Sequence, residues 1–230
     1  MRTVGLIAVY VVALIAGLIL FAPLEAALTT APSPVTAREV TGTLWRGQLK
    51  GATISGVELG DVDVRLSPLA LLTGWVRAEV ASTGAIPGEA IISAGRTGWG
   101  FEGATLAAPL STLGFSAPAT GEIRLREVSA VFANGVCAGA AGQATAQIGG
   151  RTPLRLTGRP RCEGETWVLE MRRDAGADRS ALRWSLGHDG RYVAQVRIAT
   201  ADPVYGQALE QAGFRMEQGA YVKAAKGQFR

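Results

Sequence analysis

Apolar and polar residues alternate along most of the chain beyond residue 35. Residues 61–67 read DVDVRLS and residues 122–126 read EIRLR, and residues 154–157, 182–186 and 192–198 follow similar patterns. Such alternation is typical of antiparallel strands that bury one face and expose the other. We therefore predict a mainly β fold of roughly ten to twelve short strands, built as an antiparallel β-sandwich, a curved sheet or a half-barrel.

Turns and two short helices are predicted between these strands. Residues 187–190 and the Asn134-Gly135 pair are typical of hairpin turns. Residues 67–74 and 202–213 each start with a capping residue followed by proline and end on glycine, which predicts a helix in each, with Ser67 and Asp202 as N-caps.

One more strand is predicted near the C-terminus. Residues 216–222 alternate loosely between polar and apolar side chains. We expect them to return to the sheet.

The strongest apolar run lies at the N-terminus. Residues 4–22 form a run of 19 residues without a charge or a proline, and Arg2 precedes it. A bilayer core about 30 Å thick needs about 20 helical residues, so the run predicts a transmembrane helix with its N-terminus in the cytoplasm. A signal peptide cleaved near residue 27 is the alternative, although its apolar region is usually about 7–15 residues long. Both interpretations export the remainder of the chain.

These segments predict the organisation of the chain. Residues 1–24 form the cytoplasmic tip and the anchor, residues 25–37 a linker with prolines, and residues 38–230 the β-rich domain. A short similarity between the stretches that begin at Gly42 and Gly121 raises the possibility of two related modules, at residues 38–118 and 119–230.

The composition of the chain mainly excludes classes of function. Hydrophobic residues make up 48% of the chain and charged residues 18%, and the apolar N-terminal run accounts for part of this imbalance. A net charge of +4 on an exported chain does not favour nucleic acid as a partner.

The chain has one histidine, His188, and no phosphate-binding loop or nucleophile elbow. Asp61 and Asp63 share the polar face of one predicted strand, so we expect a structural role for them. We predict no catalytic residue, cofactor or metal site.

Cys137 and Cys162 are the only cysteines, 25 residues apart. In an exported chain two cysteines favour a disulfide, and separate thiols or a metal-binding pair are the alternatives. Five tryptophans are expected mainly in the core, although an exposed subset could contact a partner. They are Trp45, Trp75, Trp99, Trp167 and Trp184.

The most specific motif lies in residues 40–47, which read VTGTLWRG. A strand leading into a proline and a Leu-Leu-x-Gly turn follow it. This order, behind a short N-terminal anchor, resembles the type II secretion system protein N family. The residues that carry the resemblance are Gly42, Leu44, Trp45, Gly47, Pro68, Leu71, Leu72 and Gly74.

The resemblance implies an accessory, structural component of the type II secretion machinery without catalytic residues. It implies a single span in the bacterial inner membrane, a β-rich bulk in the periplasm, other inner-membrane secretion components as partners, and support for the export of folded proteins. The same region is also similar to AsmA-like envelope proteins, whose β-grooves carry lipid, so a lipid-binding groove is the alternative. A scaffold outside any secretion machine is a third interpretation.

Overall fold

The computed structural model describes residues 17, 21–26, 35–54, 57–113, 121–149, 154–173 and 180–228. The predicted anchor at residues 4–22 lies almost wholly outside these residues. Among the helices in the described part of the chain, none is long and apolar enough to cross a membrane. The predicted transmembrane helix therefore stays a prediction.

The described strands form one antiparallel sheet of 15 strands, more than the sequence predicted. Its order is β1-β3-β4 and then each strand beside the next in sequence up to β13, followed by β15 and β14, while β2 pairs with β3. The strands are β1 (Val35–Thr36), β2 (Glu39–Thr43), β3 (Arg46–Ile54), β4 (Val57–Leu66), β5 (Trp75–Ser82), β6 (Gly88–Gly95), β7 (Gly98–Pro109), β8 (Gly121–Ala133), β9 (Val136–Ile148), β10 (Leu154–Glu163), β11 (Thr166–Arg172), β12 (Ala181–Gly187), β13 (Arg191–Ile198), β14 (Arg215–Glu217) and β15 (Ala220–Gln228).

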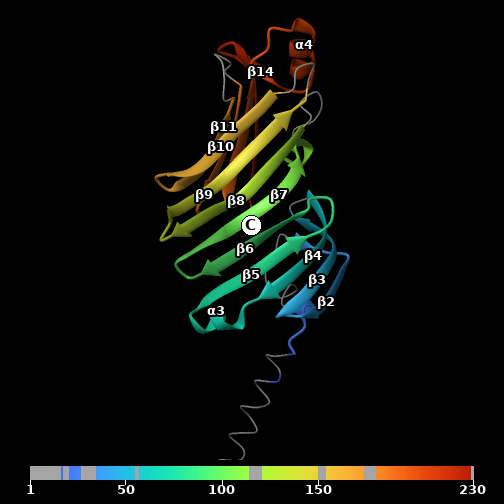
Figure 1. Ribbon diagram of the computed structural model, residues 1–230, viewed down its shortest axis with the longest axis vertical. Coiled ribbons are helices and arrows are strands. Elements are labelled where there is room, and N and C mark those ends of the chain that lie inside the picture. The colour runs from blue at the N-terminus through green and yellow to red at the C-terminus, as the bar shows by residue number, and fades with distance from the viewer. Residues whose placement is uncertain are drawn as a thin grey trace, which may run out of the picture.

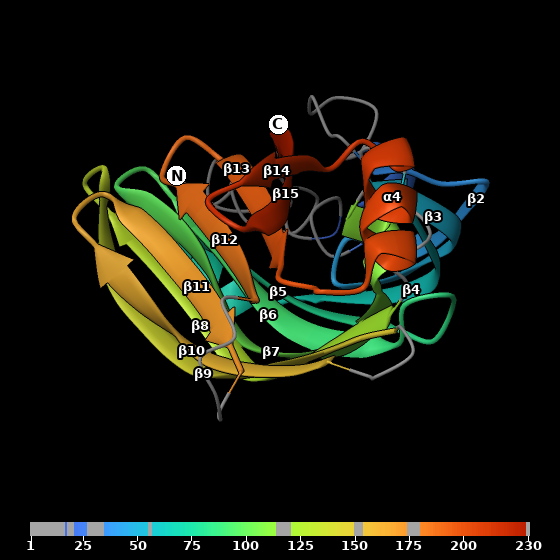
Figure 2. The ribbon, with the colours of Figure 1, turned by 90° about the horizontal axis from the view of Figure 1, so that it is seen from above.

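The sheet is curved, and this confirms one of the predicted architectures while excluding a sandwich of two sheets. Figure 1 shows the strands stacked along the long axis of the molecule. Seen from above, β12, β13, β15 and β14 curl back over β7 to β11 (Figure 2). The curl brings distant segments together, because the Trp99 indole N–H donates a hydrogen bond of 2.6 Å to the carbonyl of His188.

Most buried side chains lie on the concave face of this sheet, although Val168 on β11 is buried on the opposite face, level with Arg161 and Ser185. The larger cluster of buried residues runs from Ile86 to Tyr221, and Leu156, Leu169 and Met171 at its centre are fully buried. A smaller cluster contains Leu24, Leu49, Ala52 and Val62. The opposite, convex face carries the polar residues of each alternating strand, as the periodicity predicted.

Both predicted helices are present, but only one has the predicted cap. In α4 (Pro203–Gln211) the Asp202 carboxylate accepts hydrogen bonds from the backbone N–H groups of Val204 and Tyr205, at 2.9 and 3.3 Å. Ser67 precedes α3 (Pro68–Leu72), yet its side chain makes no capping hydrogen bond. Its backbone N–H instead donates to the Arg77 carbonyl on β5 at 2.8 Å, which ties the start of α3 to the sheet. A short 3-10 helix, η1 (Leu110–Leu113), follows β7.

Residues 216–222 return to the sheet as predicted, and they do so within a hairpin. Glu217 pairs with Ala220 across a two-residue turn between β14 and β15. Gln218 and Gly219 have φ angles of 48° and 78°, the left-handed pair that a type I′ turn requires. Glutamine is a weak turn signal at this position, so the turn was not recognised from the sequence.

Candidate functional site

The motif residues form the hairpin that joins β2 to β3. Gly42 pairs with Gly47 and Thr43 with Arg46, so Leu44 and Trp45 occupy the two-residue turn. Gly42 has a φ of 90°, and a Cβ atom there would collide with the Arg46 carbonyl. This position therefore requires glycine, which gives the first glycine of the motif a physical reason.

The hairpin holds the segment that directly follows the predicted anchor. The Leu44 N–H donates a hydrogen bond of 2.8 Å to the Ala22 carbonyl, and Pro23 forms an isolated bridge with Thr43. Leu24 is only 5% exposed and belongs to the smaller buried cluster. A Cβ atom at Gly47 would collide with the Leu24 side chain, so the second glycine of the motif makes room for Leu24 on the sheet.

The second part of the motif lies beside the first. The Leu66 N–H donates a hydrogen bond of 3.3 Å to the Trp45 carbonyl, and α3 begins two residues later at Pro68. Gly74, at a φ of 78°, ends this turn, and its N–H donates to the Leu71 carbonyl at 3.0 Å. The structure thus gathers the predicted motif residues at one end of the sheet.

The α3 turn exposes its apolar side chains. None of its residues is buried, and Leu69 and Leu72 are 75% and 84% exposed. The predicted residue Leu71 is 40% exposed. The Leu-Leu pair of the motif therefore does not contribute to the core, in contrast to what two adjacent leucines usually do.

Cys137 and Cys162 form the predicted disulfide, far along the sheet from the motif. They link β9 to β10 beyond the last hydrogen-bonded pair of these strands, Ala144 and Gly158. Pro160 lies just past this pair and has no N–H to continue the ladder. The disulfide thus joins two strands where backbone pairing between them has ended.

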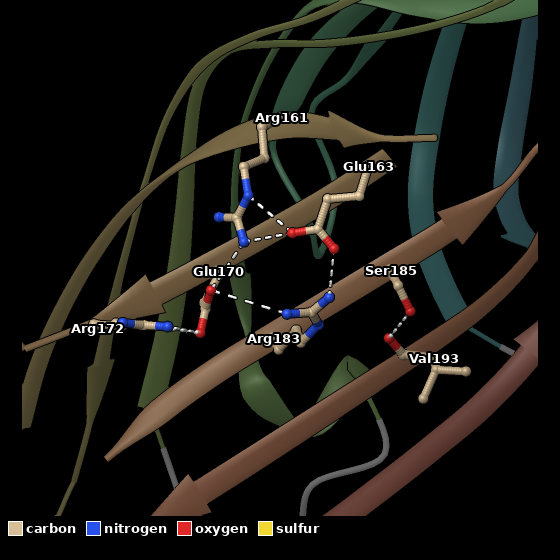
Figure 3. Close-up of polar contacts among 7 residues, drawn as sticks. All are labelled: Arg161, Glu163, Glu170, Arg172, Arg183, Ser185 and Val193. Atoms are coloured by element: carbon tan, nitrogen blue, oxygen red, sulfur yellow. Dashed lines mark hydrogen bonds and ion pairs between the residues drawn. The ribbon is translucent and has the colours of Figure 1, made fainter. Parts of the chain in front are cut away.

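A network of charged side chains crosses the convex face next to the disulfide (Figure 3). Glu170 on β11 accepts hydrogen bonds from Arg161 at 3.2 Å and from Arg172 at 2.7 and 2.9 Å. Glu163 bonds Arg161 at 2.9 Å and Arg183 at 2.8 Å, so three strands are connected.

The network shifts the pKa values of its members. Partial burial of Glu170 acts to raise its pKa, but the hydrogen bonds from Arg172 and Arg161 outweigh this effect and hold the pKa below the ordinary glutamate value. The hydrogen bond from Arg161 likewise lowers the pKa of Glu163. Both acids therefore stay charged at neutral pH, and the network acts as an electrostatic clamp across β10, β11 and β12.

A basic groove lies beside this network on the convex face. Its volume is about 490 Å³, and glutamine and threonine side chains line it together with Arg124, Arg126, Arg155 and Arg159. Arg124 pairs with Glu122 at 2.8 Å, whereas the described residues provide no ion pair for the other three arginines. The groove can accept an anionic group. It was not predicted from the sequence, although Arg124, Arg126 and Arg155 occupy alternating polar positions of two predicted strands.

An acidic hollow lies further along the same face. It has a volume of about 400 Å³ and is lined by four acids, Asp63, Glu79, Glu89 and Glu102, together with Arg65. The convex face is therefore negative toward β4 to β7 and positive toward β8 to β10. Asp63 and Asp61 are both exposed, as the alternation predicted, and Asp61 accepts a hydrogen bond of 3.1 Å from the Gly51 N–H.

The concave face of β4 to β6 is apolar and incompletely covered. Val76 and Ile92 are 44% and 45% exposed on it. Val64, Val80 and Ala90 are half-buried there. The part of the chain that the structure describes contains no group of three or more histidine, cysteine or acidic residues placed to hold a metal ion.

Comparison with known families identifies the family of this chain. The family model for protein N of the type II secretion system matches residues 33–223. The chain belongs to the type II secretion system protein N family. No curated protein and no solved structure gives a significant match.

Family membership identifies the protein as a component of the type II secretion system. The region that matches protein N contains the hairpin, α3, the disulfide and both charged surfaces. Residues 21–26, which dock on the hairpin, precede it. Protein N is a component of a larger assembly, so interaction with other secretion components is implied for this chain.

Proposed function

We propose that this protein N family member is an inner-membrane-anchored accessory component of the type II secretion system that supports the export of folded proteins from the periplasm. Residues 4–22 span the membrane with the N-terminus in the cytoplasm, and the curved sheet lies in the periplasm. The protein acts without catalysis, as a structural element that positions or holds other inner-membrane components.

The observation that carries this proposal is the docking of residues 21–26 on the motif hairpin. The 19-residue apolar run ends at residue 22, where the Ala22 carbonyl accepts its hydrogen bond from Leu44. No flexible spacer separates the run from the sheet, because Leu24 is already buried against Gly47. A membrane-spanning helix in this run would therefore hold the sheet close to the bilayer surface.

The disulfide and the convex face agree with this assignment. A disulfide persists in an oxidising compartment such as the periplasm. The convex face offers partner proteins two charged surfaces of opposite sign, and such surfaces favour specific orientation over raw affinity. The basic groove and the acidic hollow are the places where we expect contacts with other secretion components.

Two measurements test the proposal. Deletion of the gene should reduce the export of folded cargo proteins, and the intact gene should restore it. The protein should stay in the membrane fraction after carbonate extraction, and added protease should cleave the sheet domain in spheroplasts but not in intact cells. Unchanged export in the deletion strain, or a protein released by carbonate, would contradict the proposal.

A lipid-binding role is the second candidate, as in AsmA-like envelope proteins. The observation in its favour is the uncovered apolar face around Val76 and Ile92. It predicts that phospholipid co-purifies with the protein after detergent exchange and that Ile92→Asp removes it. If mass spectrometry detects no bound lipid in the wild type, this candidate is excluded.

A further inference from the structure

We propose that α3 is a second membrane contact, and that its exposed leucines insert into the periplasmic leaflet beside the transmembrane anchor. This inference rests on the proposed function, because it requires that residues 4–22 span the membrane. It assigns a role to Leu71 and Leu72 of the motif, which are not buried in the core of the sheet.

The composition of α3 is unusual for a segment exposed to water. It reads PLALL, contains no charged or polar side chain, and buries none of its residues. Leu69 and Leu72 are 75% and 84% exposed, and Phe21, at the end of the apolar run, is 78% exposed. Single exposed apolar residues are common on protein surfaces, but an entirely apolar exposed helical turn indicates an interaction site.

The position of α3 identifies a bilayer as its partner. Two backbone hydrogen bonds connect it to the anchor: Leu44 to Ala22 at 2.8 Å, and Leu66 to Trp45 at 3.3 Å. Neighbouring hydrogen-bonded segments lie about 4.8 Å apart, so Leu66 lies about two such spacings from the end of the apolar run, and α3 starts two residues after Leu66. Figure 1 shows α3 and the blue segment of residues 21–26 at the same end of the long axis.

The residues around α3 are those that membrane interfaces favour. Trp45 and Trp75 flank α3 and are half-buried, and the Trp75 ring lies against Gly95, where a Cβ atom would be 2.8 Å from it. Arg46 is exposed beside Trp45 in the hairpin. Tryptophan is enriched at the headgroup level of membranes, and arginine can reach lipid phosphates from there.

The length of α3 sets the depth of this contact. Five residues rise about 7.5 Å, far less than the roughly 30 Å of the hydrocarbon core, so α3 cannot span it. It can lie in the interface with its leucines in the acyl boundary, as short apolar anchors do. Together with the transmembrane helix this gives two attachment points, which would fix the orientation of the sheet above the membrane.

The test uses the full chain carrying Leu72→Cys, labelled with an environment-sensitive fluorophore and reconstituted in vesicles of phosphatidylethanolamine and phosphatidylglycerol. Cys137 and Cys162 are in a disulfide, so the label goes to the new thiol. Val204→Cys is the matched control, because Val204 is apolar, 69% exposed, and lies on α4 at the opposite end of the molecule. Vesicles with and without doxyl-labelled lipid are compared.

We expect the label at position 72 to show blue-shifted emission and to lose intensity with doxyl lipid, and the label at position 204 to do neither. Equal behaviour at the two positions in protein that co-floats with vesicles after carbonate treatment would overturn the inference while leaving the anchor intact. Protein that does not co-float would overturn the proposed function itself. Shielding of position 72 only after other secretion components are added would identify a protein contact and also overturn the inference.

A second variant tests the contact without a label. Leu69→Ser with Leu72→Ser should keep the protein folded, because neither side chain is buried. In protease protection on vesicles, this double variant should be cleaved near α3 faster than the wild type, whereas Val204→Ser should leave the cleavage rate unchanged. Equal rates for the double variant and the wild type would contradict the inference.

Discussion

Gly47 is a residue of the sheet against which the N-terminal segment packs, through the Leu24 side chain. The motif made Gly47 recognisable in the sequence, but its reason could not be predicted, because the side chain that fills the space belongs to Leu24, outside the motif. The collision that a Cβ atom would make with Leu24 explains the glycine. The sequence motif thus identifies Gly47 as a distinctive position, but the contact with Leu24 that explains the glycine depends on the fold.

We predict that Gly47→Val releases residues 21–26 from the sheet. The added side chain would take the space of Leu24, which is 5% exposed and belongs to the smaller buried cluster. Overpacking of this kind costs about 1–3 kcal/mol. Urea unfolding of the full chain in detergent should show this loss, and limited proteolysis should cut near residue 26 faster than in the wild type.

Gly139→Ala is the control for this variant. A Cβ atom at Gly139 would meet Val131 at 3.6 Å, which is ordinary van der Waals contact. This substitution should leave the stability unchanged or raise it by about 0.4–1 kcal/mol, because alanine restricts the unfolded chain more than glycine does. Equal losses in both variants would show that Gly47 has no special role.

At the scale of elements, the disulfide replaces the missing backbone pairing between β9 and β10. We predict that replacing Cys137 and Cys162 by alanine lowers the free energy of unfolding by about 3–4 kcal/mol, the chain-entropy value for a loop of 25 residues. Reducing agent should lower the melting temperature of the wild type and have no effect on the double variant. A wild type that is insensitive to reduction would contradict this prediction.

The charged network of β10, β11 and β12 makes stability depend on pH. The folded-state pKa of Glu170 lies below its ordinary value, so the unfolded state binds more protons in mildly acidic solution. The stability that Glu170 contributes is therefore present above about pH 5 and is lost as the pH falls through the lowered pKa. Glu170→Gln should cost about 1–3 kcal/mol at pH 7 and should flatten the decline in stability below pH 5.

Glu58→Gln is the control for the pH measurement. Glu58 is exposed on β4, and the described residues offer it no ion pair. Urea midpoints measured between pH 3 and pH 7 should follow the wild type in this variant and diverge from it in Glu170→Gln. A Glu170→Gln profile parallel to the wild type would exclude the network as a source of the pH dependence.

The elements themselves were largely predictable, because alternation and capping are local signals. Asp202 was recognised as a cap, and residues 182–186 as a strand, from their immediate neighbours. The turn at Gln218 was missed, since glutamine seldom adopts a positive φ. The pairing of Glu170 with Arg161 was also out of reach, because it depends on the register between β10 and β11, which the sequence does not specify.

At the scale of the whole molecule, the curl of the sheet divides the interior unequally. Among the described residues, 24 buried side chains form the larger cluster and four form the smaller one. Curvature depends on bulges and on packing across the concave face, so the choice between a sandwich and a curved sheet remained open in the sequence.

The larger cluster contains Ile86, Ala104 and Ala108 as well as residues of β8 to β15, so it runs across the boundary at residue 118 that the sequence suggested for two modules. The division into modules stays a prediction.

This unequal division predicts that β2 to β4 open more readily than the other strands. Four buried residues form the cluster at β2 to β4, and only Val57 and Leu59 of β4 also pack against the large cluster that β8 to β13 share. Local opening follows local burial. Backbone amide exchange should therefore be faster in β2 to β4 than in β8 to β11. Val62→Ala, which truncates a side chain only 3% exposed, should accelerate exchange in β2 to β4 and leave β9 to β11 unchanged.

Leu156→Ala is the matching variant in the large cluster, where Leu156 is fully buried. Truncation there costs about 2–5 kcal/mol and should accelerate exchange throughout β8 to β13. If Val62→Ala instead accelerates exchange equally in all strands, the sheet unfolds as one unit. The smaller cluster could then not loosen on its own. Independent opening would mean that the hairpin, α3 and residues 21–26 can move while the charged convex face keeps its shape for other secretion components.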